Sequence, residues 1–263
     1  MGARRGGAGA AGAELHRAVT MRALSPRDLL DVWDNGVHQD GVERALGILR
    51  AGCPELSYDA SLGLTVGERD ARLFQLHCLT FDHVLDGYAE CPLCTTPVEF
   101  ALDITALDVA PDHQQREGVV RSAGIEIEFR LPDSRDLHIV AEASDVEAGR
   151  RELVSRCVTL ASRDGAPVAT TELPADVIVE MARSMSRAQP AADVVLDLGC
   201  PACGHRWQTL LDITAFIWAE VAAAAKRLLR AVHTLAHAYG WREEEILQLD
   251  ERRRADYIAL VTA

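Results

Sequence analysis

The sequence lacks several features that define whole classes of protein. Its most apolar stretch, residues 216–229, is interrupted by Glu220, Lys226 and Arg227, so it falls short of the roughly 18 uncharged apolar residues of a membrane span. Aromatic residues make up only 5% of the chain. The Walker loop, the Gly-x-Ser-x-Gly elbow and the dinucleotide-binding Gly-x-Gly-x-x-Gly are all missing. The sequence therefore carries no common nucleotide-binding or hydrolase signature.

Positive charge is also scarce. The 263 residues carry a formal net charge of −13, and Lys226 is the one lysine among 27 basic residues. Residues 1–25 are the only net-basic stretch, at +3. Because a nucleic-acid-binding domain normally presents a net basic surface, duplex DNA binding by the folded part of the chain is disfavoured.

The cysteines do not form a pattern typical of a secreted protein. Their number, seven, is odd, and four of them form two Cys-x-x-Cys pairs, which argues against a disulfide framework. The residues after Arg4 and Arg5 are Gly and Ala rather than the apolar core of a secretory signal. We therefore expect a protein of the bacterial cytoplasm.

Composition and patterning predict an α+β protein that is mostly helical. The chain is 48% hydrophobic and 25% charged, the average for a globular protein. We expect four parts: a disordered Gly/Ala/Arg-rich tail at residues 1–22, an N-terminal helical region at 23–90, a zinc-ribbon-like unit with a strand and helix insert at 91–214, and a C-terminal helical region at 215–263.

Local signals predict the individual elements. Capping residues followed by apolar residues three and four apart indicate helices, and alternation of apolar and polar residues indicates strands. The predicted helices span residues 26–33, 42–51, 66–85, 135–144, 146–162, 174–188, 216–239, 243–249 and 251–260, and the predicted strands span 98–104, 125–131 and 194–198.

An internal repeat links two distant parts of the chain. Residues 91–105 align without gaps on residues 200–214, and Cys, Pro, Cys, Leu, Asp, Ile and Thr coincide. Copies this far apart need not stack as a solenoid. We interpret them as two halves of one pseudo-symmetric unit, each a strand, a Cys-Pro-x-Cys knuckle and a second strand.

The two knuckles supply a complete set of metal ligands. A closed structural zinc site needs four ligands in a tetrahedron, and Cys91, Cys94, Cys200 and Cys203 meet that number. We predict a small antiparallel zinc-ribbon-like unit that holds one structural Zn²⁺, with about a hundred residues between the knuckles in place of the usual 15–20. Reduced turns without a metal, a thioredoxin-like redox pair and an iron–sulfur centre are the alternatives. Four thiolates leave no open position, so catalysis by the metal is not expected.

The other thiols and imidazoles carry weaker signals. Cys53, Cys78 and Cys157 lie in or beside helical patterns and are expected to be inert buried thiols. His233 and His237 lie four residues apart, but Thr234 occupies the position of the Glu in a His-Glu-x-x-His motif. We expect this histidine pair in packing or in solvent.

The helix predicted at residues 216–239 has a continuous apolar seam with spacings of three and four residues. The seam either packs within the chain or docks a partner helix or subunit. For the second interpretation the candidate partner-binding residues are Trp218, Val221, Leu228, Val232, Leu235, Tyr239 and Trp241.

Several longer motifs together resemble a known family. They are Phe74-Gln-Leu-His77, Cys91-Pro-Leu-Cys94, Phe129-Arg-Leu-Pro-Asp-Ser134, Cys200-Pro-Ala-Cys-Gly-His-Arg-Trp207, Phe216-Ile-Trp-Ala-Glu220 and Tyr239-Gly240-Trp241. This set resembles the T4-type baseplate hub assembly protein family of contractile phage tails and related injection systems. The likeness runs from Leu24 to Val261, and the Tyr-Gly-Trp stretch is its most specific part.

Two positions depart from the family pattern. Thr95-Thr96 stands in the first knuckle where Gly204-His205 stands in the second. The loss of Gly is expected to loosen that turn, since Gly suits left-handed backbone best. Arg242 follows Tyr-Gly-Trp where a Ser, Thr or Asp helix cap is expected.

The resemblance implies a non-enzymatic structural or assembly role in a baseplate. Its partners would be hub, spike or wedge proteins of a contractile tail, and its location the bacterial cytoplasm or the assembled tail particle, without a membrane. The alternative is a zinc-ribbon nucleic-acid-binding adaptor that uses the arginines near the two ends of the chain, which are Arg4, Arg5, Arg17, Arg22 and Arg252–Arg254.

Overall fold

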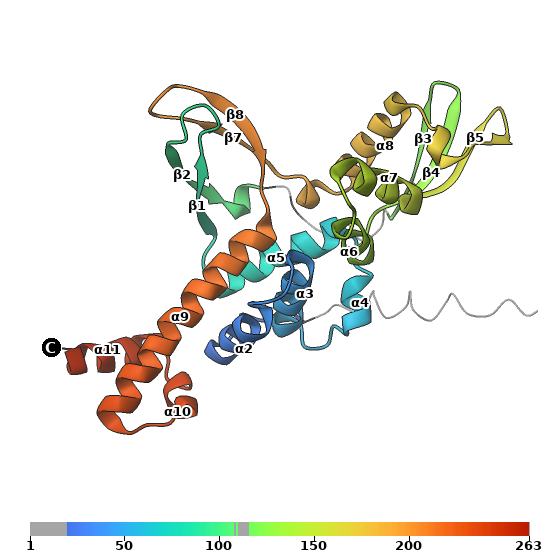
Figure 1. Cartoon of the computed structure of the whole chain (residues 1–263). Coiled ribbons are helices and arrows are strands. Elements are labelled where there is room, and N and C mark those ends of the chain that lie inside the picture. Colours follow the sequence, from blue (N-terminus) through green and yellow to red (C-terminus); the bar gives the residue numbers. More distant parts are fainter. Residues whose placement is uncertain (1–19, 108, 110–115, 263) are drawn as a thin grey trace, which may run out of the picture.

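The computed structural model describes residues 20–107, 109 and 116–262, and it has the predicted mostly helical α+β fold (Figure 1). The long helix α9 (Ile213–Tyr239) runs between two ends of the molecule. The hairpins β1–β2 and β7–β8 lie near its N-terminal end, helices α10 and α11 pack near its C-terminal end, and a separate sheet with helices α6, α7 and α8 extends on the far side of the N-terminal helices. None of the described helices is long and apolar enough to cross a membrane.

Four capped helices form the N-terminal region. They are α2 (Pro26–Gly36), α3 (Gly41–Gly52), α4 (Tyr58–Leu62) and α5 (Val66–Thr80). Each follows a Ser, Asp or Thr whose side chain accepts a hydrogen bond from a backbone N–H of the first turn. Such caps satisfy amides that the helix leaves without partners. Ser25 and Thr65 predicted the starts of α2 and α5, whereas α4 was not predicted.

The main core lies where α9 crosses α2, α3 and α5. Ile217, Val221 and Ala225 lie four residues apart on one face of α9 and are fully buried. They pack with leucines of α2, α3 and α5. Also between α5 and α9, the buried His77 has Nε2 2.8 Å from a carboxylate oxygen of Glu220. Helix α9 is therefore held along its N-terminal half by the rest of the chain.

The two knuckles form two matching hairpins. Strands β1 (Val84–Glu90) and β2 (Pro97–Asp103) pair antiparallel, as do β7 (Val195–Gly199) and β8 (Arg206–Leu210). In each hairpin the last residue of the first strand pairs with the first residue of the second, and six residues connect them. After each hairpin an Asp caps the next helical segment, which is η1 (Ile104–Ala106) or α9.

The insert between the hairpins has a sheet and a core of its own. Antiparallel strands β3 (Glu117–Ser122), β4 (Ile125–Arg130), β5 (Val158–Arg163) and β6 (Ala166–Pro167) lie in that order. The helical segments are α6 (Ser134–Ala141), α7 (Val146–Cys157), η2 (Thr170–Glu172), α8 (Ala175–Ala188) and η3 (Pro190–Ala192). The apolar residues of β4 alternate toward α7 and α8 and form a second buried cluster.

The repeat extends beyond the residues that align in sequence. Helix α5 begins at Val66 and α8 at Ala175, the same spacing of 109 residues as between Cys91 and Cys200. Each half of the repeat therefore consists of a helix followed by a knuckle hairpin.

One buried carboxylate joins the insert to the N-terminal helices, and another holds elements of the insert together. The carboxylate of Glu68 in α5 accepts two hydrogen bonds from Arg116, which precedes β3. Asp136 in α6 is 0% exposed and accepts hydrogen bonds from Arg130 at 2.6 and 2.8 Å and from Arg156 at 2.7 Å. Although burial opposes ionisation, these donors and the backbone of Asp133 hold the pKa of Asp136 well below its usual range.

The C-terminal end is a helical turn-back. Helix α9 ends at Tyr239, and Gly240, with a left-handed φ of 71°, caps it. Helices α10 (Glu243–Leu247) and α11 (Glu251–Thr262) then fold back against α9.

Two of the predicted helices were too long. The one predicted over residues 66–85 ends at Thr80, and β1 follows it from Val84. The one predicted over 146–162 ends at Cys157, where β5 begins. In both cases apolar residues continue from a helix into a strand, so periodicity alone placed the boundary too late.

The structure also tests the end of the predicted tail and contains elements that were not predicted. Residues 1–19 of the tail predicted at 1–22 lie outside the described residues. Arg22, at its end, is attached to the core, because its backbone N–H donates to the carbonyl of Gly52 and its side chain pairs with Asp28. Helix α4 and strands β3 and β6 were not predicted, although Ser57 caps α4 and Gly118-Val119-Val120 lies within β3.

Candidate metal centre

Both knuckles adopt the same turn. In the first, the N–H of Cys91 donates to the carbonyl of Thr96 at 3.0 Å, and the N–H of Thr95 donates to the carbonyl of Cys91 at 2.8 Å. In the second, Cys200 and Gly204 make the two equivalent bonds, at 2.8 and 2.9 Å. The two copies of the sequence repeat therefore form the same backbone hydrogen bonds, and these bonds orient each cysteine pair in the same way.

The turn needs one residue in the left-handed region. Gly204 has a φ of 73°, and Thr95, at the equivalent position, has a φ of 58°. Gly adopts this conformation without cost, whereas a residue with a Cβ loses roughly 1–2 kcal/mol. The first knuckle is therefore the strained copy, and it keeps both hydrogen bonds of the turn rather than being loosened as expected.

The four sulfurs form a compact cluster. The Sγ atoms of Cys91 and Cys203 lie 3.7 Å apart, and those of Cys94 and Cys200 lie 3.6 Å apart. All four sulfurs lie within 4.8 Å of one another. In a tetrahedron with metal–sulfur bonds of about 2.3 Å, the sulfurs are about 3.8 Å apart. The four cysteines therefore fit one tetrahedral metal ion, with each hairpin supplying two ligands.

Packing holds the cluster in place. Cys91 and Cys200 are buried in a small apolar group with Val98 of β2, and Trp207 of β8 packs against it. The ring of His205 stacks on that of Trp207, with 6.0 Å between ring centroids. His205 therefore lies beside the cluster and is not one of its four grouped ligands.

The thiols need a cation to ionise together. The side chain and backbone of Thr96 lower the pKa of Cys94 to about 6. The backbone of His205 lowers the pKa of Cys203, but loss of solvation and the neighbouring thiols raise it, to about 12 overall. Four close sulfurs resist carrying four negative charges, so a bound cation would stabilise all four as thiolates.

A glycine and two phenylalanines connect the first hairpin to α9. Phe100 of β2 and Phe216 of α9 meet edge to face, with ring centroids 5.9 Å apart. A Cβ at Gly87 of β1 would lie 2.5 Å from the Phe216 ring, so glycine permits this close approach. This contact was not predicted, although a Gly within a strand is a known sign of close packing.

The candidate partner-binding residues fall into two groups. Val221, Leu228 and Leu235 are buried within the chain's own core, so they are not available as a docking face in this fold. The sequence allowed both interpretations because the same apolar spacing serves packing within a chain and between chains.

The remaining candidates are more accessible. Trp218 is half-buried beneath the guanidinium of Arg44, 4.4 Å from its ring centroid, and Val232 is half-buried. Tyr239 is 41% exposed and stacks on Trp241 with ring centroids 4.8 Å apart. These two aromatics lie at the end of α9 farthest from the hairpins.

A comparison with protein families decides the general identity. The model of the T4 bacteriophage base plate proteins matches residues 38–218, which include both knuckles, the insert and the first part of α9. The chain belongs to this base plate protein family. The match does not reach α10 and α11 of this base plate protein. Searches of curated proteins and of solved structures gave no match.

Proposed function

We propose that this base plate protein is a non-enzymatic structural or assembly component of the baseplate hub of a contractile phage tail or a related injection system. Its four-cysteine cluster would hold a structural Zn²⁺. The observation that carries the proposal is the grouping of four thiols, from hairpins more than a hundred residues apart, in a protein of a baseplate family.

The position of the cluster supports a structural role for the metal. The first hairpin follows α5 directly, and the second leads directly into α9. A metal ion shared by both hairpins would therefore join the N-terminal helices to the start of α9. Because a site of this kind is absent from the unfolded chain, the free energy of metal binding becomes free energy of folding.

The ligand chemistry supports zinc and argues for a closed site. Thiolates select Zn²⁺ and iron–sulfur clusters over magnesium or calcium. Four protein ligands would fill the tetrahedron and leave no position for substrate. The protein would then contribute to the baseplate by presenting a stable surface to hub, spike or wedge proteins.

Metal analysis of the purified protein tests the proposed zinc site. We expect the purified full-length protein to contain one zinc per chain and Cys200→Ser to lose it, with a marked drop in thermal stability. Cys78→Ser, at a half-buried thiol outside the cluster, is the control and should keep both zinc and stability. Normal stability of Cys200→Ser would contradict a structural metal site, and iron in place of zinc would contradict the choice of metal.

The assembly role needs its own readout. We expect the tagged protein, expressed in its native host, to co-purify in fixed ratio with hub, spike or wedge proteins of a contractile tail. The nucleic-acid-adaptor alternative predicts instead that nucleic acid co-purifies and that its binding weakens steeply with salt. That outcome would overturn the baseplate proposal and direct attention to the arginines near both ends of the chain.

A further inference from the structure

Helices α5 and α9 meet at a pair of titratable side chains. His77 of α5 is 0% exposed, and its Nε2 lies 2.8 Å from Oε2 of Glu220 on α9. Neither of these two atoms is accessible to solvent. On the other side of the ring, Nδ1 lies 2.9 Å from the backbone carbonyl oxygen of Asp82. The imidazole is therefore held between two oxygen atoms from different segments of the chain.

Both oxygen atoms call for a proton on the ring. A carbonyl oxygen only accepts hydrogen bonds, and so does an ionised carboxylate. A neutral imidazole has one N–H and one lone pair. With the N–H on Nδ1, it bonds to Asp82 but leaves Nε2 and Oε2 of Glu220 without a partner. An imidazolium donates from both nitrogens and satisfies both oxygens, and buried polar atoms without a partner are costly.

The carboxylate is the group that keeps contact with water. The side chain of Glu220 is 32% exposed, whereas that of His77 is 0% exposed. Solvation favours the ionised form of a carboxyl group, and an ionised Glu220 can pair with a charged ring. The contacts therefore place the extra proton on His77.

No other charged side chain pairs with His77 or Glu220 in the part of the chain that the structure describes. Asp82 and Asp103 use a carboxylate oxygen to accept from the backbone N–H of His83 and of Thr105. The other titratable or charged groups on the segments packed around this end of α5 are the thiols of Cys53 and Cys78, the exposed His83, and the ion pair of Arg22 with Asp28.

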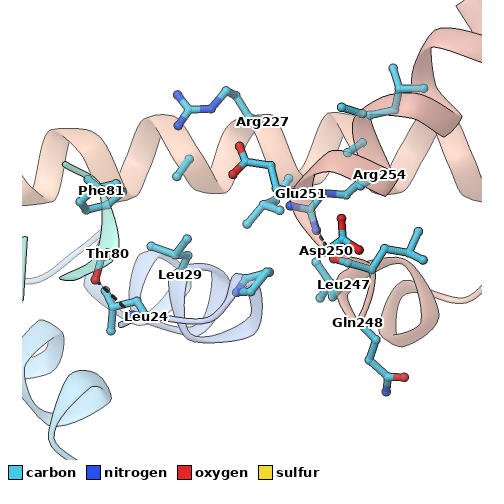
Figure 2. A pocket seen from close by; sticks show the side chains of 17 residues that line it. Leu24, Leu29, Thr80, Phe81, Arg227, Leu247, Gln248, Asp250, Glu251 and Arg254 are labelled. Carbon is cyan, nitrogen blue, oxygen red and sulfur yellow. Dashed lines mark hydrogen bonds between the residues drawn. The ribbon is translucent and has the colours of Figure 1, made fainter. Parts of the chain in front are cut away.

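The ring of Phe81 packs beside that of His77, with 5.6 Å between the centroids. Figure 2 shows Phe81 at one end of a surface groove beside α9, with Asp250, Glu251 and Arg254 toward the other end. Arg227 is exposed and lies two turns beyond Glu220 on α9. Glu220 is therefore the one side chain that can hold the charge of His77 in this part of the fold.

We propose that His77 is an imidazolium in the folded protein at neutral pH, and that its proton is a pH-sensitive latch between α5 and α9. When the proton is lost at higher pH, a lone pair of Nε2 faces the carboxylate 2.8 Å away with no donor between them. The contact then weakens between the helix that leads into the first hairpin and the helix that follows the second.

The latch predicts the sign of the pH dependence. A histidine in the unfolded chain loses its proton near pH 6.5, whereas the folded chain keeps the proton on His77. Above that pH the folded state binds more protons than the unfolded state, so stability falls as the pH rises. One proton corresponds to an increase of about tenfold in the unfolding equilibrium constant per pH unit.

The protonation state of the ring can be measured directly. Long-range proton–nitrogen NMR spectra of the full-length protein separate an imidazolium from either neutral tautomer. At pH 7.5 we expect both nitrogens of His77 to carry a proton. A neutral ring at this pH would overturn the proposal, and this measurement does not depend on any variant that must fold.

Glu220→Gln is the matched variant for the stability test. Its amide can donate to Nε2 while Nδ1–H still donates to Asp82, so a neutral ring satisfies every bond. The ratio of the wild-type to the variant unfolding constant should rise about tenfold between pH 6.5 and 7.5. Urea titration at each pH measures both constants, and groups that titrate alike in the two proteins, including the cluster thiols, cancel in the ratio.

His237→Gln, at an exposed histidine of α9, is the control. The ratio of the wild-type unfolding constant to that of His237→Gln should stay nearly constant over the same range. A ratio for Glu220→Gln that also stays constant would overturn the latch, as would a tenfold change that appears equally in His237→Gln.

Discussion

Removal of the charge on the buried Asp136 should cost more stability than removal of the charge on an exposed carboxylate that also pairs with arginine. Asp136 is fully buried and accepts three hydrogen bonds from Arg130 and Arg156, whose side chains are 33% and 30% exposed. In Asp136→Asn both arginines lose their counter-ion. Removing one partner of a buried pair typically costs about 3–5 kcal/mol.

Partial exposure of the two arginines reduces that cost, since water can solvate them in the variant. We therefore expect Asp136→Asn to lower the free energy of unfolding by about 2–3 kcal/mol. At roughly 2–4 °C per kcal/mol for a chain of this size, the melting temperature should fall by about 4–12 °C. Urea denaturation monitored by circular dichroism measures the first quantity and differential scanning calorimetry the second.

Glu126→Gln is the matched control. Both carboxylate oxygens of Glu126 in β4 accept hydrogen bonds from the guanidinium of Arg121 in β3, at 3.0 and 2.8 Å, and both side chains are exposed to solvent. Exposed pairs contribute little to stability, so this variant should melt close to the wild type. Equal destabilisation by Glu126→Gln and Asp136→Asn would refute the argument that burial decides the effect.

The pH dependence supplies a second check on Asp136. Its folded-state pKa lies below its ordinary value, so the ionised carboxylate stabilises the fold above the unfolded-state pKa of about 3.9. This contribution is lost as the pH falls through that value toward the folded-state pKa. The stability difference between wild type and Asp136→Asn should therefore be constant near neutrality and shrink below about pH 4. A difference that grows on acidification would contradict the assignment.

Two further predictions concern the hairpins. Thr95→Gly should relieve left-handed strain and raise the free energy of unfolding by about 0.5–1 kcal/mol. Gly204→Ala at the equivalent position should lower the free energy of unfolding by about 1–2 kcal/mol. Denaturant titration measures both changes, and changes of the same sign would show that the two turns are not equivalent. Gly87→Ala places a Cβ 2.5 Å from the Phe216 ring and should cost about 1–3 kcal/mol through overpacking. Gly199→Ala meets no atom within 4 Å and should lower the melting temperature less than Gly87→Ala does.

Features set by neighbouring residues were predictable. The caps Ser25, Thr65 and Asp250 located the starts of α2, α5 and α11, because a cap depends only on a side chain and amides two or three residues away. The Cys-Pro-x-Cys knuckles and the repeat identified the four cysteines that the structure brings within 4.8 Å. The helix-to-strand changes after Thr80 and Cys157 were misplaced, because apolar residues continue across both.

Features set by long-range packing were not predictable in the same way. The seam on α9 was compatible with a core or with a partner, and only the positions of α2, α3 and α5 show that Val221 and Leu235 are buried within the chain. Arg254 belongs to a run of three arginines that looks like a solvated face. Its burial depends on how α10 and α11 fold back on α9.

The sequence by itself therefore determined which segments become capped helices and knuckle hairpins, and which four thiols are paired for a metal, because these depend on contacts within a few residues. The tertiary structure decided that the two knuckles face each other, which helix faces are buried, and that Arg254 is buried while its neighbours Arg252 and Arg253 are exposed. Those outcomes depend on packing contacts between side chains from distant segments, and a local sequence pattern does not predict such contacts.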